Sequence, residues 1–318
     1  MYDVIAVGSA NVDIFLDTNI HEHFFDRKKE VCYPLGAKIR VTGVETFTGG
    51  GGTNCAVAFS RLGLKTGYIG KIGKDANGEM IYNELDREKV KFLGILGDEK
   101  TDFSIILDSK HHDDRTILNY KGASTELRYE EVNHSYPAWY YFSSLLGESF
   151  ETLKKIARTC KDRINVGFNA SNYLAEKGIE GLKDILNVTT VFVLNKEEAM
   201  LLTKGKKIGD MLVKLRKAGP RIVCITDGDE GSYTYDGKFM YYQKPHKIKV
   251  VEKTGAGDAY AATLVAGLIK GKSIEESLGM ALANAESVIA YKGAKNILLS
   301  WDNVKNTAGP KLIKKRLE

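Results

Sequence analysis

The stretch EKTGAGDAY, residues 252–260, stands between a β-like segment and a long run of small apolar residues. Within it, Gly255, Ala256 and Gly257 directly precede an acid, Asp258, at the point where a helix is expected to begin. The first turn of a helix leaves its N–H groups unpaired and carries partial positive charge, so small residues there allow an anion to approach the backbone. The stretch therefore predicts a helix start that can receive a phosphate.

Asp258 itself has two interpretations. In the first, its carboxylate takes the proton of an attacking hydroxyl while the neighbouring N–H groups stabilise charge on a phosphoryl group. In the second, Asp258 only complements the helix dipole and the glycines only form a tight turn. Other motifs have to decide between them.

A second glycine-rich stretch, FTGGGGTNCAVAFSRLG, covers residues 47–63. Four successive glycines cost backbone entropy on folding, which favours a need for close backbone approach to a ligand. Asn54 could present its amide to hydroxyls, although a polar residue in the first turn of a helix also occurs for local reasons.

The composition describes an ordinary globular protein. The chain has 318 residues, of which 43% are hydrophobic and 27% charged, and its net charge is +5. Lys and Arg are scattered rather than gathered into stripes, so nucleic acid is not an expected partner. Four distant cysteines without a CxxC pair predict reduced thiols, and no apolar run approaches the length of a membrane span. We expect a cytoplasmic protein that does not associate with membranes.

Short apolar runs alternate with helical patterns along the chain. The expected strands are DVIAVG (3–8), WYYFSSL (139–145), INVGFN (164–169), TTVFVLN (189–195) and RIVCIT (221–226). The expected helices include TNCAVAFSRLG (53–63), NGEMIYNELDREK (77–89), SFETLKKIARTCK (149–161), IEGLKDILN (179–187) and IGDMLVKLRKAG (208–219), the first and last closed by a glycine. This alternation predicts one α/β domain over residues 1–318, with a mostly parallel sheet covered by helices on both faces.

Two segments depart from the alternation. Residues 13–48 and 101–123 read as extended strands with partly polar faces. We expect them to project from the main sheet as a small lid.

The two glycine-rich stretches, GGGGTNCAVAFSRLG and TGAGDAYAATLVAGL, lie in this order and roughly 200 residues apart. Five further segments, GSANVDIF, DRTILNYKGAS, NKEEA, ITDGDEGSY and ANAESVIAYKGA, fill the rest of the pattern in order. Together they resemble the ribokinase-like, or PfkB, family of carbohydrate and nucleoside kinases, over nearly the whole chain.

This resemblance implies a doubly wound α/β sheet with a small β-sheet lid, and transfer of the γ-phosphate of ATP to a primary hydroxyl of a sugar or sugar-like substrate. It implies that Asp258 is the base and that Gly255, Ala256 and Gly257 form the anion hole. The residues implied to hold substrate hydroxyls are Asn11, Asp13, Gly50, Gly51 and Asn54.

The resemblance also assigns residues to the nucleotide. Asn195 and Glu198 would organise Mg²⁺ and its waters, because magnesium takes few direct protein ligands. Their spacing fits a helix N-cap with its capping-box partner equally well, and the two roles are compatible. Thr226, Gly228 and Asn284 are implied to line the nucleotide pocket.

The segment before the anion hole departs from the family. Glu252 stands where the family usually has Asp, and Lys253 where it often has Thr. Because this segment binds an activating K⁺ in many members, Glu252 could hold a monovalent cation; alternatively, the Lys253 ammonium takes the place of the ion. The lid segments also contain His21, His23, His111 and His112, which we interpret as solvated loop residues rather than a metal cluster.

The leading functional hypothesis is therefore an ATP- and magnesium-dependent sugar kinase. A nucleoside kinase of the adenosine type is the alternative within the family, and a non-catalytic binding protein on the same fold is the alternative from another class. The presence of Asp258 and the glycines before it favours an enzyme. Its expected partners are a small sugar or nucleoside and, through the lid, a second copy of the chain.

Overall fold

The computed structural model describes residues 1–18, 22–25, 28–31, 34–109, 115–132, 135–160, 163–307 and 312–317. Their largest feature is a ten-stranded sheet with the order β18-β17-β16-β15-β14-β13-β12-β1-β6-β8. From β15 to β8 along this order the strands are parallel, and β16, β17 and β18 are antiparallel. Their bounds are β1 (Val4–Val7), β6 (Thr66–Ile69), β8 (Lys91–Phe92), β12 (Trp139–Phe142), β13 (Asn165–Asn169), β14 (Val191–Asn195), β15 (Ile222–Thr226), β16 (Ser232–Tyr235), β17 (Phe239–Gln243) and β18 (Ile313–Arg316).

Alternate side chains of these strands enter two separate cores. In β1, Val4 and Ala6 belong to one core and Ile5 and Val7 to the other, and all four are fully buried. Successive residues of a strand point to opposite faces, so a strand that is apolar throughout must be covered on both sides. The expectation of a sheet between two layers of helices is confirmed.

Two groups of helices provide this cover. One core is formed with α1 (Gly51–Arg61), α2 (Ala76–Arg87), α9 (Ala256–Ile269), α10 (Ile274–Ile289) and α11 (Trp301–Val304). The other is formed with α3 (Gly147–Thr159), α4 (Asn172–Ala175), α5 (Gly178–Gly181), α6 (Lys183–Leu186), α7 (Lys196–Thr203) and α8 (Ile208–Lys217).

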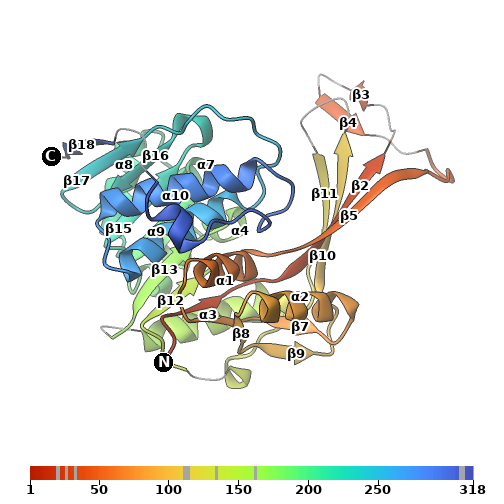
Figure 1. The fold of residues 1–318 in the computed structure, drawn as a ribbon, viewed down its shortest axis with the longest axis horizontal. Helices are drawn as coiled ribbons and strands as arrows, with labels where there is room; N and C mark the ends of the chain where they lie inside the picture. The colour runs from red at the N-terminus through yellow and green to blue at the C-terminus, as the bar shows by residue number, and fades with distance from the viewer. Residues whose placement is uncertain are drawn as a thin grey trace.

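A smaller sheet extends from one end of this body (Figure 1). Its strands are β2 (Asn11–Thr18), β5 (Val41–Gly49), β10 (Asp102–Ser109) and β11 (Arg115–Tyr120), in the order β11-β10-β2-β5. They come from the two segments in which the sequence predicts extended strands, and the side chains of residues 116–120 on β11 are exposed. The chain therefore enters the smaller sheet from β1 and returns to the body at residues 50 and 121.

The remaining elements are short. Two-stranded pairs are formed by β3 (Glu22–Phe25) with β4 (Lys28–Val31) and by β7 (Lys71–Gly73) with β9 (Ile95–Gly97). Single 3₁₀ turns cover Ala123–Thr125, Tyr129–Glu131 and Gly228–Glu230.

Most expected elements agree with the structure, and one differs. Gly63 and Gly219 follow α1 and α8 with positive φ, as their closing role requires. The single helix expected over 179–187 is instead the two short helices α5 and α6, which meet at Leu182, where φ is −103° and ψ is 4°. A glycine in the last turn of α5 weakens helix propensity at this point. Cys55, Cys160 and Cys224 are free thiols, as expected.

Within the described residues, no helix combines the length and apolar character needed to cross a membrane.

Candidate active site

Helix α9 begins within the glycine-containing stretch of residues 252–260. Gly255 is its N-cap, with a φ of 83° that strains residues with side chains, and no side chain caps the helix. Among the described residues, the N–H groups of Gly255, Gly257 and Asp258 have no acceptor within hydrogen-bond distance, whereas that of Ala256 bonds to the carbonyl oxygen of Lys253 at 3.3 Å. The helix start thus offers unpaired donors that suit an anion such as phosphate.

Asp258 lies half-buried in the first turn of α9. Asn54 Nδ2 donates a hydrogen bond to Asp258 Oδ2 at 2.8 Å, which joins the two glycine-rich stretches directly. Burial raises the pKa of Asp258, whereas the bond from Asn54 and the positive charge of Lys295 act to lower it. A carboxylate with a raised pKa is a stronger base, and the net shift therefore suits proton abstraction.

Gly50 and Gly51, at the start of α1, allow the backbone to pass close to Ala10, Ser143 and Asp258. Gly50 has a φ of 95°, and a Cβ there would lie 2.6 Å from Ala10 Cα. A Cβ on Gly51 would lie 3.4 Å from Asp258 Oδ1 and would collide with Ser143 Oγ. Side chains at these two positions would therefore push the turn away from Asp258.

Asn11 and Asp13 lie at the start of β2 and are almost completely buried. Asn11 Nδ2 donates to Asp13 Oδ1 at 2.6 Å and to Ser104 Oγ at 3.2 Å. Burial raises the pKa of Asp13, against hydrogen bonds from Ser104 and Asn11 and the charges of Lys295 and Lys121. The two predicted hydroxyl-binding side chains are thus joined to each other.

A cavity of about 240 Å³ opens beside Asp258. Its lining includes Gly51, Asp258 and polar side chains that the sequence analysis did not single out, among them Ser9, Asn119, Lys121, Ser143 and Asn169. Ser143 and Asn169 stand directly after or at the carboxyl ends of β12 and β13, where ligands of open parallel sheets bind. A polar residue closing an apolar strand was the sequence signal for both.

Lys121 is held in this cavity by a buried acid. Its Nζ lies 3.3 Å from Asp102 Oδ2, and the Asp102 side chain is completely buried. Asp102 Oδ1 also accepts from the N–H groups of Gly122 and Ser124, at 2.9 and 3.1 Å. The return of the chain from the smaller sheet is therefore fixed next to Asp258.

Asn195 and Glu198 form the capping box that their spacing predicts. Asn195 Oδ1 accepts from the N–H of Glu198, and Glu198 Oε2 accepts from the N–H of Asn195, both at 2.8 Å. Burial raises the pKa of Glu198 to about 7, and the negative charge of Asp258 acts in the same direction. Carboxylate oxygen is the ligand type that Mg²⁺ prefers, so Glu198 suits its predicted role toward magnesium and its waters.

Two nucleotide-side residues lie near this capping box. Thr226 ends β15 and is the register partner of Asn195 at the end of β14. Gly228 has a φ of 51°, and no heavy atom would lie within 4 Å of a Cβ there. Their contacts with a nucleotide stay predictions, as does the role of Glu198 toward magnesium.

The placement of Asn284 differs from its expected position in a nucleotide pocket. Its side chain is fully buried between α9 and α10, where Nδ2 donates to Thr263 Oγ1 at 2.7 Å and Oδ1 accepts from the N–H of Leu299 at 2.8 Å. These bonds join α9, α10 and the segment that follows α10, and a contact of Asn284 with a nucleotide stays a prediction. An exposed asparagine and a buried one have the same sequence signal, so the pattern did not distinguish them.

The segment before the anion hole favours one of the two potassium hypotheses. Glu252 Oε1 accepts from the N–H and Oγ1 of Thr254, at 2.9 and 2.8 Å. Lys253 is exposed, which agrees with the hypothesis in which it points into solvent. A cation at Glu252 stays a prediction. His21, His111 and His112 lie outside the described residues, as does the side chain of His23; among the described residues, no three His, Cys, Asp or Glu side chains gather as a metal centre.

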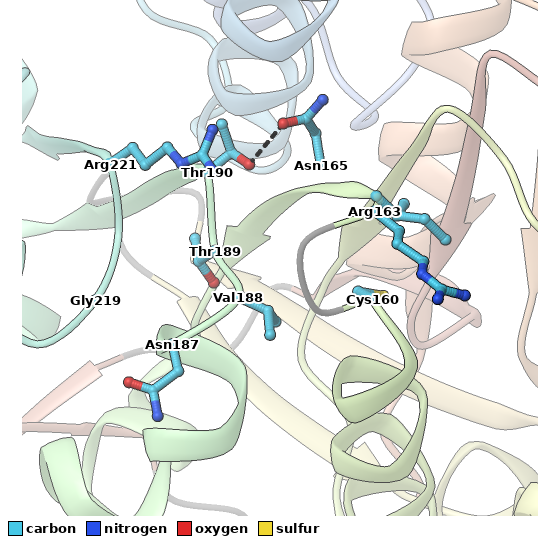
Figure 2. A pocket seen from close by; sticks show the side chains of 10 residues that line it. Cys160, Arg163, Asn165, Asn187, Val188, Thr189, Thr190, Gly219 and Arg221 are labelled. Carbon is cyan, nitrogen blue, oxygen red and sulfur yellow. Dashed lines mark hydrogen bonds between the residues drawn. The ribbon is translucent and has the colours of Figure 1, made fainter.

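A second cavity, of about 270 Å³, lies at the amino ends of β13, β14 and β15 and is distant from the carboxyl edge that carries Asn195. Figure 2 shows Asn165 joined to Thr190, with Arg163 and Arg221 on opposite sides of the view. The two guanidinium groups do not converge on one point, so this cavity does not form a focused anion site.

Comparison with known proteins agrees with this geometry. Residues 1–301 match the pfkB family of carbohydrate kinases. The chain is 29% identical over 276 residues to the probable fructokinase-5 of Arabidopsis thaliana, covering 80% of this chain and 85% of the relative. Two solved structures share its fold: an Arabidopsis thaliana ribokinase complexed with ribose and ATP (TM-score 0.78, 21% identity, 95% and 97% of the two chains covered) and the adenosine kinase of Sinorhizobium meliloti (TM-score 0.81, 21% identity, 96% and 99% covered).

The fold is that of a ribokinase-like α/β protein, and the chain belongs to the pfkB family of carbohydrate kinases. It is an ATP-dependent carbohydrate kinase.

Proposed function

We propose that this kinase transfers the γ-phosphoryl group of ATP to a primary hydroxyl of a sugar, with Asp258 as the base. The observation that carries the proposal is the start of α9, where unpaired N–H groups stand next to a carboxylate that faces a polar cavity. A base beside an anion site is the arrangement that phosphoryl transfer to an alcohol needs.

The residues divide between the two substrates. Asn11, Asp13, Gly50, Gly51 and Asn54 hold acceptor hydroxyls, and Asn195, Thr226 and Gly228 lie on the nucleotide side. Asp258 accepts the proton of the attacking hydroxyl, and the N–H groups of Gly255 and Gly257 receive the negative charge of the phosphoryl oxygens. The N–H of Ala256 can join them only by leaving its bond to Lys253. A magnesium ion held through water by Glu198 would neutralise phosphate charge.

The removal of the base tests this assignment. Asp258→Asn keeps the shape of the side chain and its contact with Asn54, so we expect a kcat lower by about 10² to 10⁴ with nearly unchanged folding and ATP binding. Steady-state kinetics and calorimetric ATP binding would measure this, and near-normal turnover of the variant contradicts the role of Asp258.

The acceptor is tested by ADP release from pentoses, hexoses, keto-deoxy acids and nucleosides. We expect a sugar to give the highest kcat/KM. The fold similarity to an adenosine kinase keeps a nucleoside as the second candidate, and preference for nucleosides in this screen would replace the sugar assignment. A lack of turnover with every acceptor would favour a binding protein on the same fold.

Two further proposals concern the setting of the enzyme. The smaller sheet acts as a lid over the cavity and as the contact between two copies of the chain. We place the enzyme in the cytoplasm.

A further inference from the structure

Lys295, in the segment after α10, is a buried lysine that the proposed reaction does not use. Its side chain is 4% exposed. Its Nζ lies 2.6 Å from Glu84 Oε2 on α2 and 3.3 Å from Thr53 Oγ1 on α1. Glu84 Oε2 also accepts from Thr48 Oγ1 at the end of β5.

The Lys295–Glu84 pair supports the glycine-rich turn that precedes α1. Thr53 Oγ1 donates to the carbonyl oxygen of Gly49 at 2.6 Å, and the next residue, Asn54, donates to Asp258. The pair thus contacts both flanks of the turn, through Thr48 and Thr53. On its other side, Arg61 Nη1 donates to the carbonyl oxygen of Lys295 at 2.9 Å, which fixes the segment that carries the lysine.

The same ammonium acts on two carboxylates of the site. Its positive charge favours the ionised forms of both Asp13 and Asp258, against the burial that disfavours them. Burial also lowers the pKa of Lys295 itself, and the carboxylates of Glu84, Asp13 and Glu88 act to keep it charged. The titratable groups that act on these two carboxylates and Lys295 are Cys55 and Tyr141 at Asp258, Glu198 on α7, Lys121 in the cavity, Glu84 on α2 and Glu88 directly after α2. Lys295 is the cation that acts on both carboxylates within the described residues.

Burial of such a pair does not by itself stabilise a protein. Removing two charges from water costs free energy that their attraction often fails to recover, and apolar residues of similar volume are often neutral or more stable in the same place. Because this ion pair contacts both flanks of the glycine-rich turn, we look for its role in holding that turn in place.

We propose that Lys295 is a positioning residue for phosphoryl transfer, whose buried pair with Glu84 holds the turn that carries Asn54 and whose positive charge lies beside that turn. The inference rests on the proposed function, because it assigns Asp258 the base that has to be ionised.

The test compares kcat/KM against pH in three variants. Lys295→Met combined with Glu84→Gln removes both charges at similar volume, so that neither partner stays buried alone. We expect the acid limb of its profile to move to higher pH, with a rate about tenfold lower on that limb for each unit of movement. Glu84→Gln alone leaves the Lys295 ammonium in place. The acid limb of the kcat/KM profile of this variant should therefore stay at the wild-type pH or move to lower pH. Lys295→Arg should retain the wild-type limb.

Lys71 provides the matched control. It is also buried, at 5% exposed, and pairs with Glu99 and Glu131 at 3.1 and 3.5 Å, but it is not among the groups that act on Asp258. Lys71→Met should leave the acid limb unchanged. If it moves the limb as far as the double variant does, or if Glu84→Gln moves it upward to the same extent, the inference is overturned.

A titration without turnover separates this inference from the proposed function. The carboxyl carbon-13 signal of Asp258, assigned by its loss in Asp258→Asn, should titrate at higher pH in the double variant than in the wild type. Equal titration in the two proteins overturns the role of Lys295, even where the kinase assignment holds. A wild type that phosphorylates no acceptor contradicts the proposed function while this titration still reads the charge effect.

Discussion

Gly255 and Gly257 stand two residues apart at the start of α9, but a side chain would meet different surroundings at each. A Cβ on Gly255 would lie 2.5 Å from Ala294 Cβ, and its φ is 83°. A Cβ on Gly257 would have no heavy atom within 4 Å. Packing therefore requires the first glycine, whereas the second leaves open the space in which we place a phosphate.

This contrast gives a prediction for Gly257→Ala. Alanine favours a helix over glycine by up to about 1 kcal/mol, so the variant should be as stable as the wild type or more stable. Its methyl group should raise the KM for ATP or lower kcat several-fold. Thermal unfolding and steady-state kinetics measure the two effects. Gly255→Ala is the control, and strain of about 1–2 kcal/mol should destabilise it. Unchanged kinetics of Gly257→Ala would remove Gly257 from the anion hole.

A second residue-scale prediction separates the two roles of Glu198. Glutamine keeps an oxygen that accepts from the N–H of Asn195, so Glu198→Gln should not lower the stability by more than about 1 kcal/mol. Loss of the carboxylate should raise several-fold the magnesium concentration that gives the half-maximal rate. Rates measured against free magnesium decide this, and an unchanged profile leaves only the capping role.

The raised pKa of Glu198 determines how the stability difference between Glu198→Gln and the wild type depends on pH. A folded pKa of about 7, above the ordinary 4.5, means that the folded state favours the protonated carboxyl. That contribution to stability is present below pH 4.5 and is lost as the pH rises through about 7. In magnesium-free buffer the stability of Glu198→Gln relative to the wild type should therefore increase over this range.

For single residues, the sequence indicated which side chains belong to the candidate site, but it did not show which of them contact each other. Asn54 and Asp258 are 204 residues apart, and only the fold brings them to 2.8 Å. Lys295 reads as an ordinary lysine in a loop, because burial of a charged side chain depends on partners from other elements. The burial of Asn284 was not visible in the sequence for the same reason.

Asp75 joins two elements, the N-terminus of α2 and the start of β10. Its carboxylate accepts from the N–H of Gly78 at 2.9 Å and from the N–H and Oγ1 of Thr101 at 2.9 and 2.7 Å. Burial acts to raise the pKa of Asp75, but the hydrogen bonds from Thr101 and Gly78 outweigh it and lower the pKa below 3.8. Its ionised form therefore stabilises the fold.

We expect Asp75→Asn to lower the free energy of unfolding by about 1 kcal/mol at neutral pH. Because the folded pKa is lowered, the contribution is present above the ordinary pKa and is lost as the pH falls through the folded value, so the difference should shrink in acid. Urea unfolding across pH measures it. Asp98→Asn, which removes an exposed partner of Lys74, should have little effect. A difference that persists in strong acid would contradict the role of the charge.

Helices and strands could be predicted where the pattern of apolar residues was clear. Strands buried on both faces, such as β1 and β14, give continuous apolar runs that the sequence shows directly. The break between α5 and α6 was not visible, because both halves continue the same apolar pattern and only local dihedral angles separate them.

At the scale of the whole molecule, the smaller sheet carries exposed apolar side chains far from either core. Val44, Ile117 and Leu118 are 63%, 48% and 54% exposed. Apolar patches of this kind mark interaction sites, and the edge strands β5 and β11 leave backbone groups available for pairing. This agrees with our proposal that two copies associate through the sheet.

We expect a dimer in sedimentation equilibrium and a monomer for Leu118→Lys, since a charge in an apolar contact is costly to bury. Ile313→Lys, at an equally exposed site on β18 of the main sheet, should leave the mass unchanged. A wild type that sediments as a monomer at every concentration contradicts the dimer.

Only Gly8, Ser9 and Ala10 separate β1 from β2, and this short link is fixed from both sides. The N–H of Gly8 donates to the carbonyl oxygen of Ile69 at 3.1 Å, and the carbonyl oxygen of Ser9 accepts from the N–H of Gly52 at 3.0 Å. Any rotation of the smaller sheet about this link would be a lever motion with Asn11 beside the pivot. The hydroxyl-binding end would then keep its alignment while the far end of the sheet moves farthest. In two copies that associate through their sheets, closure over one acceptor would therefore be coupled to closure over the other.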